Sequence, residues 1–445
     1  MLTSDENELL CRVEAAAPMG RLMRRYWLPA CLSEELPDPD GTPVPVRLLG
    51  EDLVAWRNSV GTVGVMDRYC PHRRASLVFG RNEENGLRCL YHGWKMDTDG
   101  NVVEMPSEPP GSCQAQRGKM KSYPAREAAG IVWTYMGPAD GIPEFRPPVF
   151  GKTEHTKTSI VKIQVNCNWA QCLEGNIDSA HSSTLHSSNI KPGVVGGTKV
   201  IGMTSVRPST DKAPRMQVQR TDYGFKYAAI RRPIKDADVN DYVRVTLFVA
   251  PFMALIPPNN QYASAALAVP IDDTHTMFHF IAWSDEPGGG VDQEFYRKRQ
   301  GAQVGIHLDR QYRKRGSPEN GYLQNRQAMK LGDFSGIEGV PNQDIAMWET
   351  MGPIADRTTE RLGASDVAIV EFRRLMVEEA RRVRDADPQA GGTLTIPHGD
   401  LSDLQAFEGM RRKSSEWRDL DSVRAQQQVG ATQARSATEQ TQGQR

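Results

Sequence analysis

Two short motifs, Cys70-Pro-His72 and Cys89-Leu-Tyr-His92, constrain the fold of this chain more than any other feature. Together they read C-x-H-x16-C-x2-H, so each motif offers one thiolate and one imidazole to a metal centre. This interleaved order is typical of a Rieske [2Fe–2S] centre, in which two Cys hold one iron and two His hold the other. Zinc also accepts two Cys and two His, but zinc sites usually keep like ligands together. The spacing therefore favours a Rieske cluster held by two neighbouring loops.

A second metal motif lies in the stretch from Glu174 to His186, where Asp178, His181 and His186 follow a D-x2-H-x4-H spacing. Steps of three and five residues are close to one and one and a half helical turns, so a bent or irregular helix can turn these groups toward one point. Two imidazoles and one carboxylate with open positions form the facial triad of non-haem Fe(II) oxygen chemistry. We therefore predict a mononuclear iron site here.

The carboxylate of such a triad must come from elsewhere if Asp178 has another role. The candidates downstream are Asp344, Glu349, Asp356 and Asp366. Asp356 is placed like a surface cap, and Asp366 opens the last predicted helix, so both have ordinary structural explanations. Asp344 is followed by an apolar helical run that we expect to be buried.

Length and composition limit the classes of protein that this chain can form. A chain of 445 residues suggests two domains, and 39% apolar residues suffice for a real core. A net charge of −1 gives no sign of the basic excess that nucleic-acid binding requires. The sequence contains no run of about 20 apolar residues, so no membrane span is predicted. The first ten residues lack the apolar region of a signal peptide. We expect a cytoplasmic protein, with no nucleic-acid partner and no membrane.

The cysteine count agrees with a reducing compartment. Besides the two cysteines of the cluster motif, five others show no disulfide framework spacing, and we expect free thiols: Cys11, Cys31, Cys113, Cys167 and Cys172.

Hydrophobic patterns divide the chain into three parts. We predict a first domain over residues 1–150, with a core of about 27–136 and an N-terminal helix from residue 4 to 25 that has Ser4 as its N-cap and leads onto this domain. Short apolar runs over 44–66 predict antiparallel strands, and the two cluster loops should be hairpin tips. The second domain should span 151–423. Residues 424–445, rich in Gln, Ala and Thr, predict a flexible tail.

The second domain should contain a helix that leads into the iron ligands, followed by a sheet. A helix is predicted from Asn166 to about Glu174, with the iron ligands following where it becomes irregular. Five runs between residues 216 and 283 predict strands, and a long amphipathic helix is predicted from Ser365 to about Asp385. We expect its apolar side to comprise Val367, Val370, Phe372, Met376 and Val377, and its polar side Arg373, Arg374, Arg381 and Arg382.

On four stretches, Cys70–Ser76, Cys89–Trp94, Leu173–Ser188 and Asn342–Asp366, the chain resembles the Rieske non-haem iron aromatic-ring-hydroxylating oxygenases, as their catalytic α subunit. It is most similar to the phthalate 4,5-dioxygenase group. The resemblance implies an α+β fold, with an N-terminal all-β Rieske [2Fe–2S] domain followed by a helix-grip (START-like) catalytic domain with a large antiparallel sheet. It also implies two cofactors, the [2Fe–2S] Rieske cluster and a mononuclear Fe(II).

The resemblance assigns roles to the metal motifs as well. Cys70, His72, Cys89 and His92 correspond to the cluster ligands, and His181, His186 and Asp344 to the iron ligands. Asp178 corresponds to an acid that links an iron-ligating His to a cluster His of the neighbouring subunit. This implies a homotrimer, with stacking into a hexamer left open. One departure is Arg74, which stands where most relatives have Gly.

An aromatic dicarboxylate substrate would need buried cations, and the planar fork of Arg matches a carboxylate best. By resemblance to the phthalate group we choose Arg207 and Arg244, with Ser179 as an added hydroxyl. Surface salt bridges remain the alternative explanation for both arginines. Arg231 and Arg232 are second choices, and only one of them could enter a pocket, because neighbours in a strand point to opposite faces.

The implied reaction is NADH- and O2-dependent cis-4,5-dihydroxylation of phthalate. A Rieske monooxygenase or O-demethylase acting on a methoxy- or phenoxybenzoate stays open, because it would use the same iron residues. A pure electron-transfer Rieske protein is the rival from another class, and the long second domain speaks against it. No plant-type C-x4-C-x2-C run or dinucleotide fingerprint is present in the sequence, so a separate NADH-dependent reductase with FMN and [2Fe–2S] is implied. Five further histidines lack ligand-like spacing: His155, His275, His279, His307 and His398.

Overall fold

The computed structural model of the chain describes residues 1–109, 118–386 and 400–426. Three expectations concern residues outside the described ranges: the free thiol at Cys113, the structural role of His398, and the tail from residue 427 onward. Of the predicted free thiols, the four that the structure describes are buried and form no disulfide: Cys11, Cys31, Cys167 and Cys172. No helix within the described ranges combines the length and the apolar character that a bilayer span requires.

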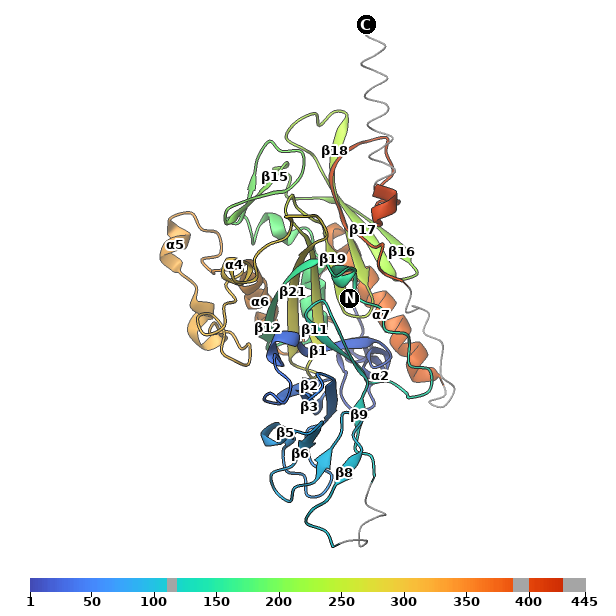
Figure 1. Ribbon diagram of the computed structural model, residues 1–445. Helices are drawn as coiled ribbons and strands as arrows, with labels where there is room; N and C mark the ends of the chain where they lie inside the picture. The colour runs from blue at the N-terminus through green and yellow to red at the C-terminus, as the bar shows by residue number, and fades with distance from the viewer. Residues whose placement is uncertain (110–117, 387–399, 427–445) are drawn as a thin grey trace.

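The N-terminal part of the chain forms three small antiparallel sheets (Figure 1). One sheet has the order β1-β11-β10 (Trp27–Leu32, Ile131–Tyr135, Ala125–Ala128). The next has the order β2-β3-β4-β9 (Val44–Leu48, Glu51–Arg57, Val63–Asp67, Ser122–Tyr123) and confirms the meander predicted for residues 44–66. The third has the order β5-β6-β7-β8 (Arg81–Glu83, Gly86–Arg88, Lys95–Met96, Val102–Glu104) and carries the second cluster loop between β6 and β7.

The strands next to the cluster loops enclose a small core of their own. Val54, Trp56, Met66, Leu87 and Met96 are buried there together, apart from the main core. An antiparallel bridge between Tyr69 and Ser76 closes the first cluster loop at its base. Both loops therefore project from a compact support, which agrees with the predicted hairpin tips.

The C-terminal part is dominated by one large antiparallel sheet. Its order is β12-β21-β20-β19-β18-β17-β16, with these bounds: Lys157–Val165, Thr276–Ser284, Ala263–Pro270, Met253–Ile256, Asn240–Val249, Gly224–Arg231 and Arg215–Thr221. The five strands predicted between residues 216 and 283 are all present. A second, three-stranded sheet has the order β13-β15-β14 (Ile190–Pro192, Thr204–Arg207, Lys199–Ile201). The predicted α+β class is therefore confirmed.

Three strands of this sheet, β12, β19 and β22 (Phe407–Arg412), were not predicted, and β22 is the least expected of them. β22 pairs with β18 over Asn240–Val245, beside the stretch Leu247–Val249 that pairs with β19. Its sequence, Phe-Glu-Gly-Met-Arg-Arg, lacks the β-branched residues that mark strands. The free edge of β18, rather than intrinsic propensity, explains its conformation.

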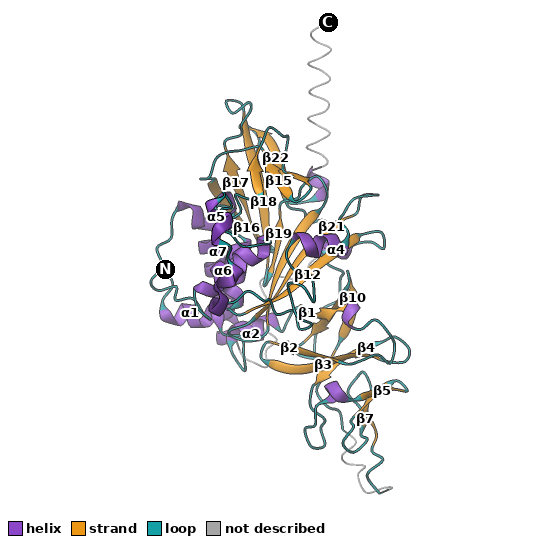
Figure 2. Ribbon diagram, turned by 90° about the vertical axis from the view of Figure 1, so that its left-hand side faces the viewer, coloured by secondary structure: helices purple, strands orange, loops and turns teal. Residues whose placement is uncertain are grey.

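Helices cover one side of the large sheet (Figure 2). α3 (Trp169–Asn176) packs on β19 and β20, and α7 (Val367–Asp385) packs on β16 and β17. The remaining helices are α1 (Ser4–Cys11), α2 (Pro18–Met23), α4 (Gln293–Arg299), α5 (Arg326–Lys330) and α6 (Val340–Thr350). Short 3-10 turns lie at Ser33–Glu35, Leu77–Phe79, Val149–Gly151, His181–Ser183, Pro318–Leu323 and Ala364–Asp366.

Two details of the predicted helices were wrong. The residues from 4 to 25 form two helices, not one, with Thr3 as the N-cap in place of Ser4, and both helices pack against α7 at the far end of the sequence. In α7, Val367 and Val370 are exposed, whereas Arg373 is buried. Arg373 leaves the polar side because it pairs with Glu174 and Glu360, and a paired guanidinium can be buried. The predicted domain boundary at residue 150 stays a prediction.

Candidate metal centres and active site

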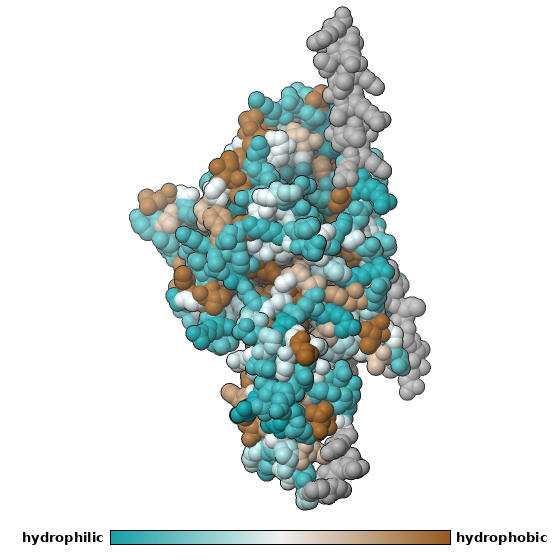
Figure 3. All heavy atoms as spheres, viewed as in Figure 1, coloured by the Kyte–Doolittle hydropathy of each residue, from teal (hydrophilic) through white to brown (hydrophobic). Residues whose placement is uncertain are grey.

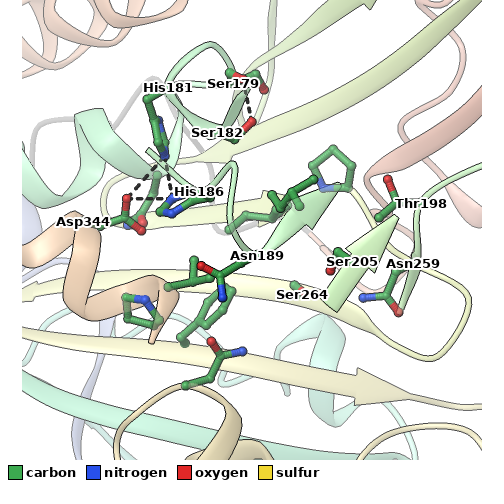
Figure 4. Close-up of a pocket in the computed structure, with 18 of the residues that line it drawn as sticks. Ser179, His181, Ser182, His186, Asn189, Thr198, Ser205, Asn259, Ser264 and Asp344 are labelled. Atoms are coloured by element: carbon green, nitrogen blue, oxygen red, sulfur yellow. Dashed lines mark hydrogen bonds and ion pairs between the residues drawn. The ribbon is translucent and has the colours of Figure 1, made fainter. Parts of the chain in front are cut away.

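The structure brings three residues of the predicted iron site to one point. His181 Nε2 and His186 Nε2 lie 3.1 Å apart, and Asp344 Oδ1 lies 3.3 Å from the first and 3.0 Å from the second. In Figure 4 the three side chains converge at one end of a cavity. Across the described residues, this is the only group of three or more His, Cys, Asp or Glu side chains close enough to share a metal ion. Two imidazoles and one carboxylate are the donors that Fe(II) takes in a facial triad, so the residues fit this ion.

Local structure explains how two sequence-distant segments meet here. α3 begins at the N-cap Asn168, whose side chain accepts from Ala170 N, and it ends at Asn176, so the ligands follow in an irregular segment as predicted. α6, which carries Asp344, packs against α3, and its Trp348 contacts Gly175. A Cβ on Gly175 would lie 2.1 Å from Trp348 Nε1, so only glycine allows this approach.

Each histidine has a different partner at its other ring nitrogen. His181 Nδ1 lies 3.3 Å from Asp178 Oδ2, while the second oxygen of Asp178 accepts from Ala180 N at 2.7 Å. His186 Nδ1 lies 2.7 Å from Gln343 Oε1. Both contacts hold a proton on Nδ1 and leave Nε2 free to face the metal.

Gln343 was missed by the sequence reasoning. Its Nε2 donates to Asn189 Oδ1 and to Ile337 O, both at 2.9 Å, so its Oε1 is left to accept from His186. The side chain is fully buried. The sequence did hold a signal. A glutamine directly before a predicted ligand, in a helix that is expected to be buried, has a polar amide that needs a hydrogen-bond partner.

Electrostatics favours a charged form of both acids. Burial opposes ionisation, yet the neighbouring His186 and His181 lower the pKa of Asp344 to about 2. Burial likewise opposes ionisation of Asp178, but His181 and two backbone N–H groups lower its pKa. For His181, burial disfavours the cation while Asp178 and Asp344 raise the pKa to about 10. A divalent cation would replace the protons between these groups.

The candidate iron ligands border a cavity of about 190 Å³ that the predicted substrate residues also line. Ser179, Arg207 and Arg244 all line it. Apolar walls come from Ile256, Pro257, Phe278 and Phe280. Figure 4 places Thr198, Ser205 and Asn259 across the cavity from the iron ligands. The space is therefore apolar in its middle, with metal ligands and polar groups on opposite sides.

Neither predicted arginine is a surface residue in an ion pair. Within the described part of the chain, no carboxylate oxygen lies within 4.0 Å of a guanidinium nitrogen of Arg207 or Arg244. Arg207 Nη1 donates to Ser182 Oγ at 3.1 Å, and its Nε is buried without a partner. Arg244 Nη1 makes only long contacts, of 3.4 Å each, to the hydroxyls of Thr198 and Tyr242.

A third buried arginine lies next to these two. Arg231 is 1% exposed, and its Nη2 donates to Ser179 O at 2.6 Å, while Nε and Nη1 have no partner. Pairing of β17 with β18 places Arg231 opposite Tyr242 and Ala229 opposite Arg244, so both arginines point to the same face. Arg232 is exposed, as expected for the neighbour in a strand.

These cations repel one another. Burial and the nearby Arg244 lower the pKa of Arg207 to about 9, and the same causes lower the pKa of Arg231 to about 10. Arg244 differs, because burial is outweighed by Tyr242 and Glu408, which raise its pKa. The cluster of Arg207, Arg231 and Arg244 therefore carries more positive charge than Glu408 balances, and an anion would relieve the repulsion.

The other sequence candidates are placed elsewhere. Glu349 pairs with Lys314. Asp356 accepts from Thr358 N at the surface, and Asp366 accepts from Gly363 N in the turn before α7. His275 pairs with Asp272, His279 is buried within β21, His155 is exposed, and His307 accepts from Gln303 N.

The cluster motif forms a second candidate metal centre. The rings of His72 and His92 lie 4.4 Å apart, and Trp94 stacks on His72 at 4.7 Å. Burial raises the pKa of Cys70 to about 11, with the adjacent Cys89 adding to the rise, while the N–H groups of His72 and Arg73 point at its sulfur. His72 Nδ1 is buried without a hydrogen-bond partner. Two neighbouring thiols and an unpartnered ring nitrogen fit a cationic metal cluster.

Arg74 occupies a backbone conformation that favours glycine. Its φ is +59°, which explains why Gly is common at this position in the resembled family. Its guanidinium donates to Asp67 Oδ2 at 2.9 Å and lies over the ring of Tyr69. These contacts offset the backbone strain and leave the cluster residues in place.

Fold and donor sets together define a two-domain, two-metal oxygenase subunit. The family described as "LigXa C-terminal domain like" matches residues 134–442, and the Rieske [2Fe–2S] domain family matches residues 26–124. The chain belongs to the Rieske oxygenases with a LigXa-like C-terminal domain, and its cofactors are a Rieske [2Fe–2S] cluster and a mononuclear iron.

Individual relatives cover nearly the whole chain. The oxygenase subunit of phthalate 4,5-dioxygenase from Pseudomonas putida is 58% identical over 94% of this chain and 94% of its own length. The oxygenase subunit of 3-chlorobenzoate-3,4-dioxygenase from Comamonas testosteroni is 38% identical over 88% of this chain and 91% of its own. The terminal oxygenase of carbazole 1,9a-dioxygenase from Nocardioides aromaticivorans IC177 shares the fold, with a TM-score of 0.53 at 18% identity over 85% and 98% of the two chains.

Proposed function

We propose that this chain is the oxygenase component of a phthalate 4,5-dioxygenase, which converts phthalate, with NADH and O2, to cis-4,5-dihydro-4,5-dihydroxyphthalate. One observation carries the choice of substrate. A cavity lined by the proposed iron ligands is also lined by Arg207, whose buried Nε has no hydrogen-bond partner, and by Arg244, and the two cations lie close enough that Arg244 lowers the pKa of Arg207. A planar dianion supplies the charge and the acceptor pairs that these groups lack. The similarity to the Pseudomonas putida oxygenase subunit supports the same substrate.

The arrangement of the cavity supports attack at the 4,5 edge. Arg244 donates to Thr198, which lies across the cavity from His186 and Asp344 (Figure 4). A carboxylate bound at Arg244 would direct the opposite edge of the ring toward the iron. In phthalate, carbons 4 and 5 form that opposite edge. Phe278 and Phe280 supply the apolar surface that a ring packs against.

The chain's own residues bind, orient and exclude water. The bound iron supplies O2 activation, and the cluster supplies electrons one at a time. Asp178 holds the Nδ1 proton of His181, and Gln343 holds that of His186, so both imidazoles keep their orientation. The buried faces of Phe278 and Pro257 keep water from the ring.

We infer a homotrimer in which the cluster of one copy serves the iron of the next. Apolar side chains are exposed on the cluster loops at Phe79, Leu90 and Tyr91, and others are exposed around α5, including Leu331 and Phe334. Figure 3 shows brown patches on the projection that carries α5 in Figure 1. Two different apolar surfaces on one chain suit a head-to-tail ring. Asp178, at the iron end, is the proposed electron bridge.

Electrons must arrive from outside this chain, and an oxygenase subunit implies a separate reductase. We propose that the reductase is NADH-dependent and carries FMN and a [2Fe–2S] centre. The buried free thiols agree with a reducing, cytoplasmic location.

The test of the substrate assignment is selectivity of the arginine variants. Arg244→Ala should weaken phthalate binding by about 2–5 kcal/mol, at least about thirtyfold, because the carboxylate loses its charged partner inside the cavity. Binding of a neutral ring such as dimethyl phthalate should change much less. Equilibrium dialysis on the holoprotein measures both, and Arg215→Ala, at the surface, is the control. Equal losses for diacid and diester would contradict the assignment.

A demethylase or monooxygenase remains the second candidate function, since the relatives include a 5,5'-dehydrodivanillate O-demethylase oxygenase subunit from Sphingobium at 32% identity. Turnover of 3-methoxybenzoate in place of phthalate would favour it.

A further inference from the structure

One residue that lines the cavity at the iron site is exposed to solvent. Among its lining residues, all of which the structure describes, Met203 alone is exposed, with 50% of its surface accessible. Met203 lies in the turn between β14 and β15, after Gly202 at φ +59°. This hairpin turn therefore borders the mouth of the cavity.

A second and larger cavity begins at the same place. It has a volume of about 570 Å³ and lies among the loops of residues 299–343. Asn189, Met203 and Arg299 line both cavities, so these three residues lie at the boundary between them, which we call the neck. The exposed side chains of Arg315 and Leu323 also line the larger cavity, which shows that it opens to solvent.

Arg299 is the cation of this neck. It is the last residue of α4, and it donates to Tyr262 Oη at 2.7 Å and to Ser205 Oγ at 3.1 Å. Within the described ranges, no carboxylate oxygen lies within 4.0 Å of its guanidinium, whereas Arg297 on the same helix pairs with Glu34 and Glu294.

The charges around the larger cavity otherwise balance. Lys314 is paired with Glu349 at 2.5 Å, and Arg315 faces a space that also contains Asp333 and Glu338. Long-range attraction by the whole cavity is therefore weak. Arg299 is held by neutral hydroxyls, and the described part of the chain gives it no countercharge. A carboxylate that passes the neck would therefore be attracted to this unbalanced cation.

Resting on the proposed function, we propose that the aromatic acid reaches the iron through the larger cavity, and that Arg299 binds its carboxylate at the neck before Arg207 and Arg244 receive it. Met203, an unbranched side chain that changes shape easily, lets the ring pass.

The route is tested by narrowing the neck. Met203→Trp should slow the association of phthalate with the holoprotein at least about tenfold, as measured by stopped-flow binding, while the equilibrium Kd from dialysis stays within about twofold, because release is slowed equally. Ile201→Trp is the matched control, since Ile201 is exposed in the same hairpin and lines neither cavity. Equal association rates for the two variants, or a parallel loss of equilibrium binding in Met203→Trp, would overturn the route.

The role of Arg299 is tested by its charge. Arg299→Gln keeps donors for Ser205 and Tyr262, and it should lower kcat/KM about tenfold for phthalate but less than about twofold for dimethyl phthalate. Lys298→Gln, an exposed residue of the same helix, is the control. Equal losses for the diacid and the diester would show that Arg299 only supports the hairpin.

A third measurement separates the route from the proposed function. Neutral 2,2′-bipyridyl extracts mononuclear iron, while the visible absorbance of the cluster reports its integrity. Extraction should be slower in Met203→Trp than in Ile201→Trp, even if phthalate is not turned over. That result with no phthalate turnover would keep the route and reject the proposed function. Phthalate turnover with no difference between the variants in either assay would reject the route alone.

Discussion

The two proposed metal sites, in the cluster loops and beside the main core, are built in different ways. Cys70, Cys89 and Trp94 belong to a small core at the tip of the N-terminal part, separate from the main core, and the loops expose much of their surface. The iron ligands lie beside the main core, between α3 and α6, and charged or amide side chains hold both histidines. The loops suit docking and electron transfer, whereas the buried site suits controlled access of substrate.

The comparison also bears on where electrons travel. The proposed cluster ligands and iron ligands of one chain sit in separate parts of the fold, and the half-buried Asp178 lies 3.3 Å from the ring of His181. A neighbouring copy can therefore supply the cluster that a chain's own iron uses.

The largest effect is expected from removing one metal at a time. Cys89→Ser should abolish the cluster, and Asp344→Ala should abolish the iron, so turnover of each variant falls to background. Each variant should keep the other metal, as measured by iron content and visible absorbance. Co-expressed chains carrying one change each, purified through two different tags, should regain turnover. A doubly tagged complex as inactive as its parents would place electron transfer within one chain.

A smaller effect is expected at the link between the sites. Asp178→Asn should leave both metals bound but slow single-turnover oxidation of the cluster at least about tenfold, which is about 1.4 kcal/mol in barrier. The reason is that the amide cannot hold His181 as the carboxylate does. Asp400→Asn is the control, because the exposed Asp400 accepts a similar backbone N–H two residues ahead, from Ser402. Unchanged single-turnover rates would remove Asp178 from the electron path.

Gln343 should affect the iron site alone. Gln343→Leu removes the acceptor for His186 and should weaken Fe(II) binding about 10- to 100-fold. Gln343→Glu keeps an acceptor and should restore much of the affinity. Equilibrium titration of the iron-depleted protein with Fe(II), or with Co(II) as a spectroscopic probe, measures both. Equal loss in the two variants would mean that Gln343 only fills space.

The smallest effect is expected in the exposed cluster loop. Arg74→Gly relieves a left-handed backbone conformation but removes the exposed pair with Asp67, and these contributions nearly cancel. The free energy of unfolding should change by less than about 1 kcal/mol, and the cluster spectrum should be retained. Loss of the cluster would show that the Arg74 contacts hold the loop.

The two regions also differ in how far the sequence predicts them. The cluster ligands stand within two short loops, so their spacing alone indicates the metal. The iron site could be predicted only in part from the sequence. The spacing of the two histidines indicates a metal, but Asp344 is distant in the chain, and it was chosen over Glu349 because of the resemblance to a known family. Arg207 and Arg244 were chosen in the same way, whereas Arg299 and Gln343 were missed because only tertiary packing brings them to the cavity.

Fold prediction succeeded where patterns are local. The strands between residues 216 and 283 and helix α7 carry strong periodicity and were predicted. β22 and the packing of α1 on α7 depend on contacts between distant segments, which periodicity does not encode.

The central claim, dioxygenation of phthalate, is tested most directly by the product. Holoprotein with NADH, a competent reductase, phthalate and ¹⁸O₂ should yield a dihydrodiol in which both new oxygens carry the label, as read by mass spectrometry. The absence of any phthalate product, together with singly labelled or demethylated product from 3-methoxybenzoate, would contradict the claim and assign the chain to the monooxygenases.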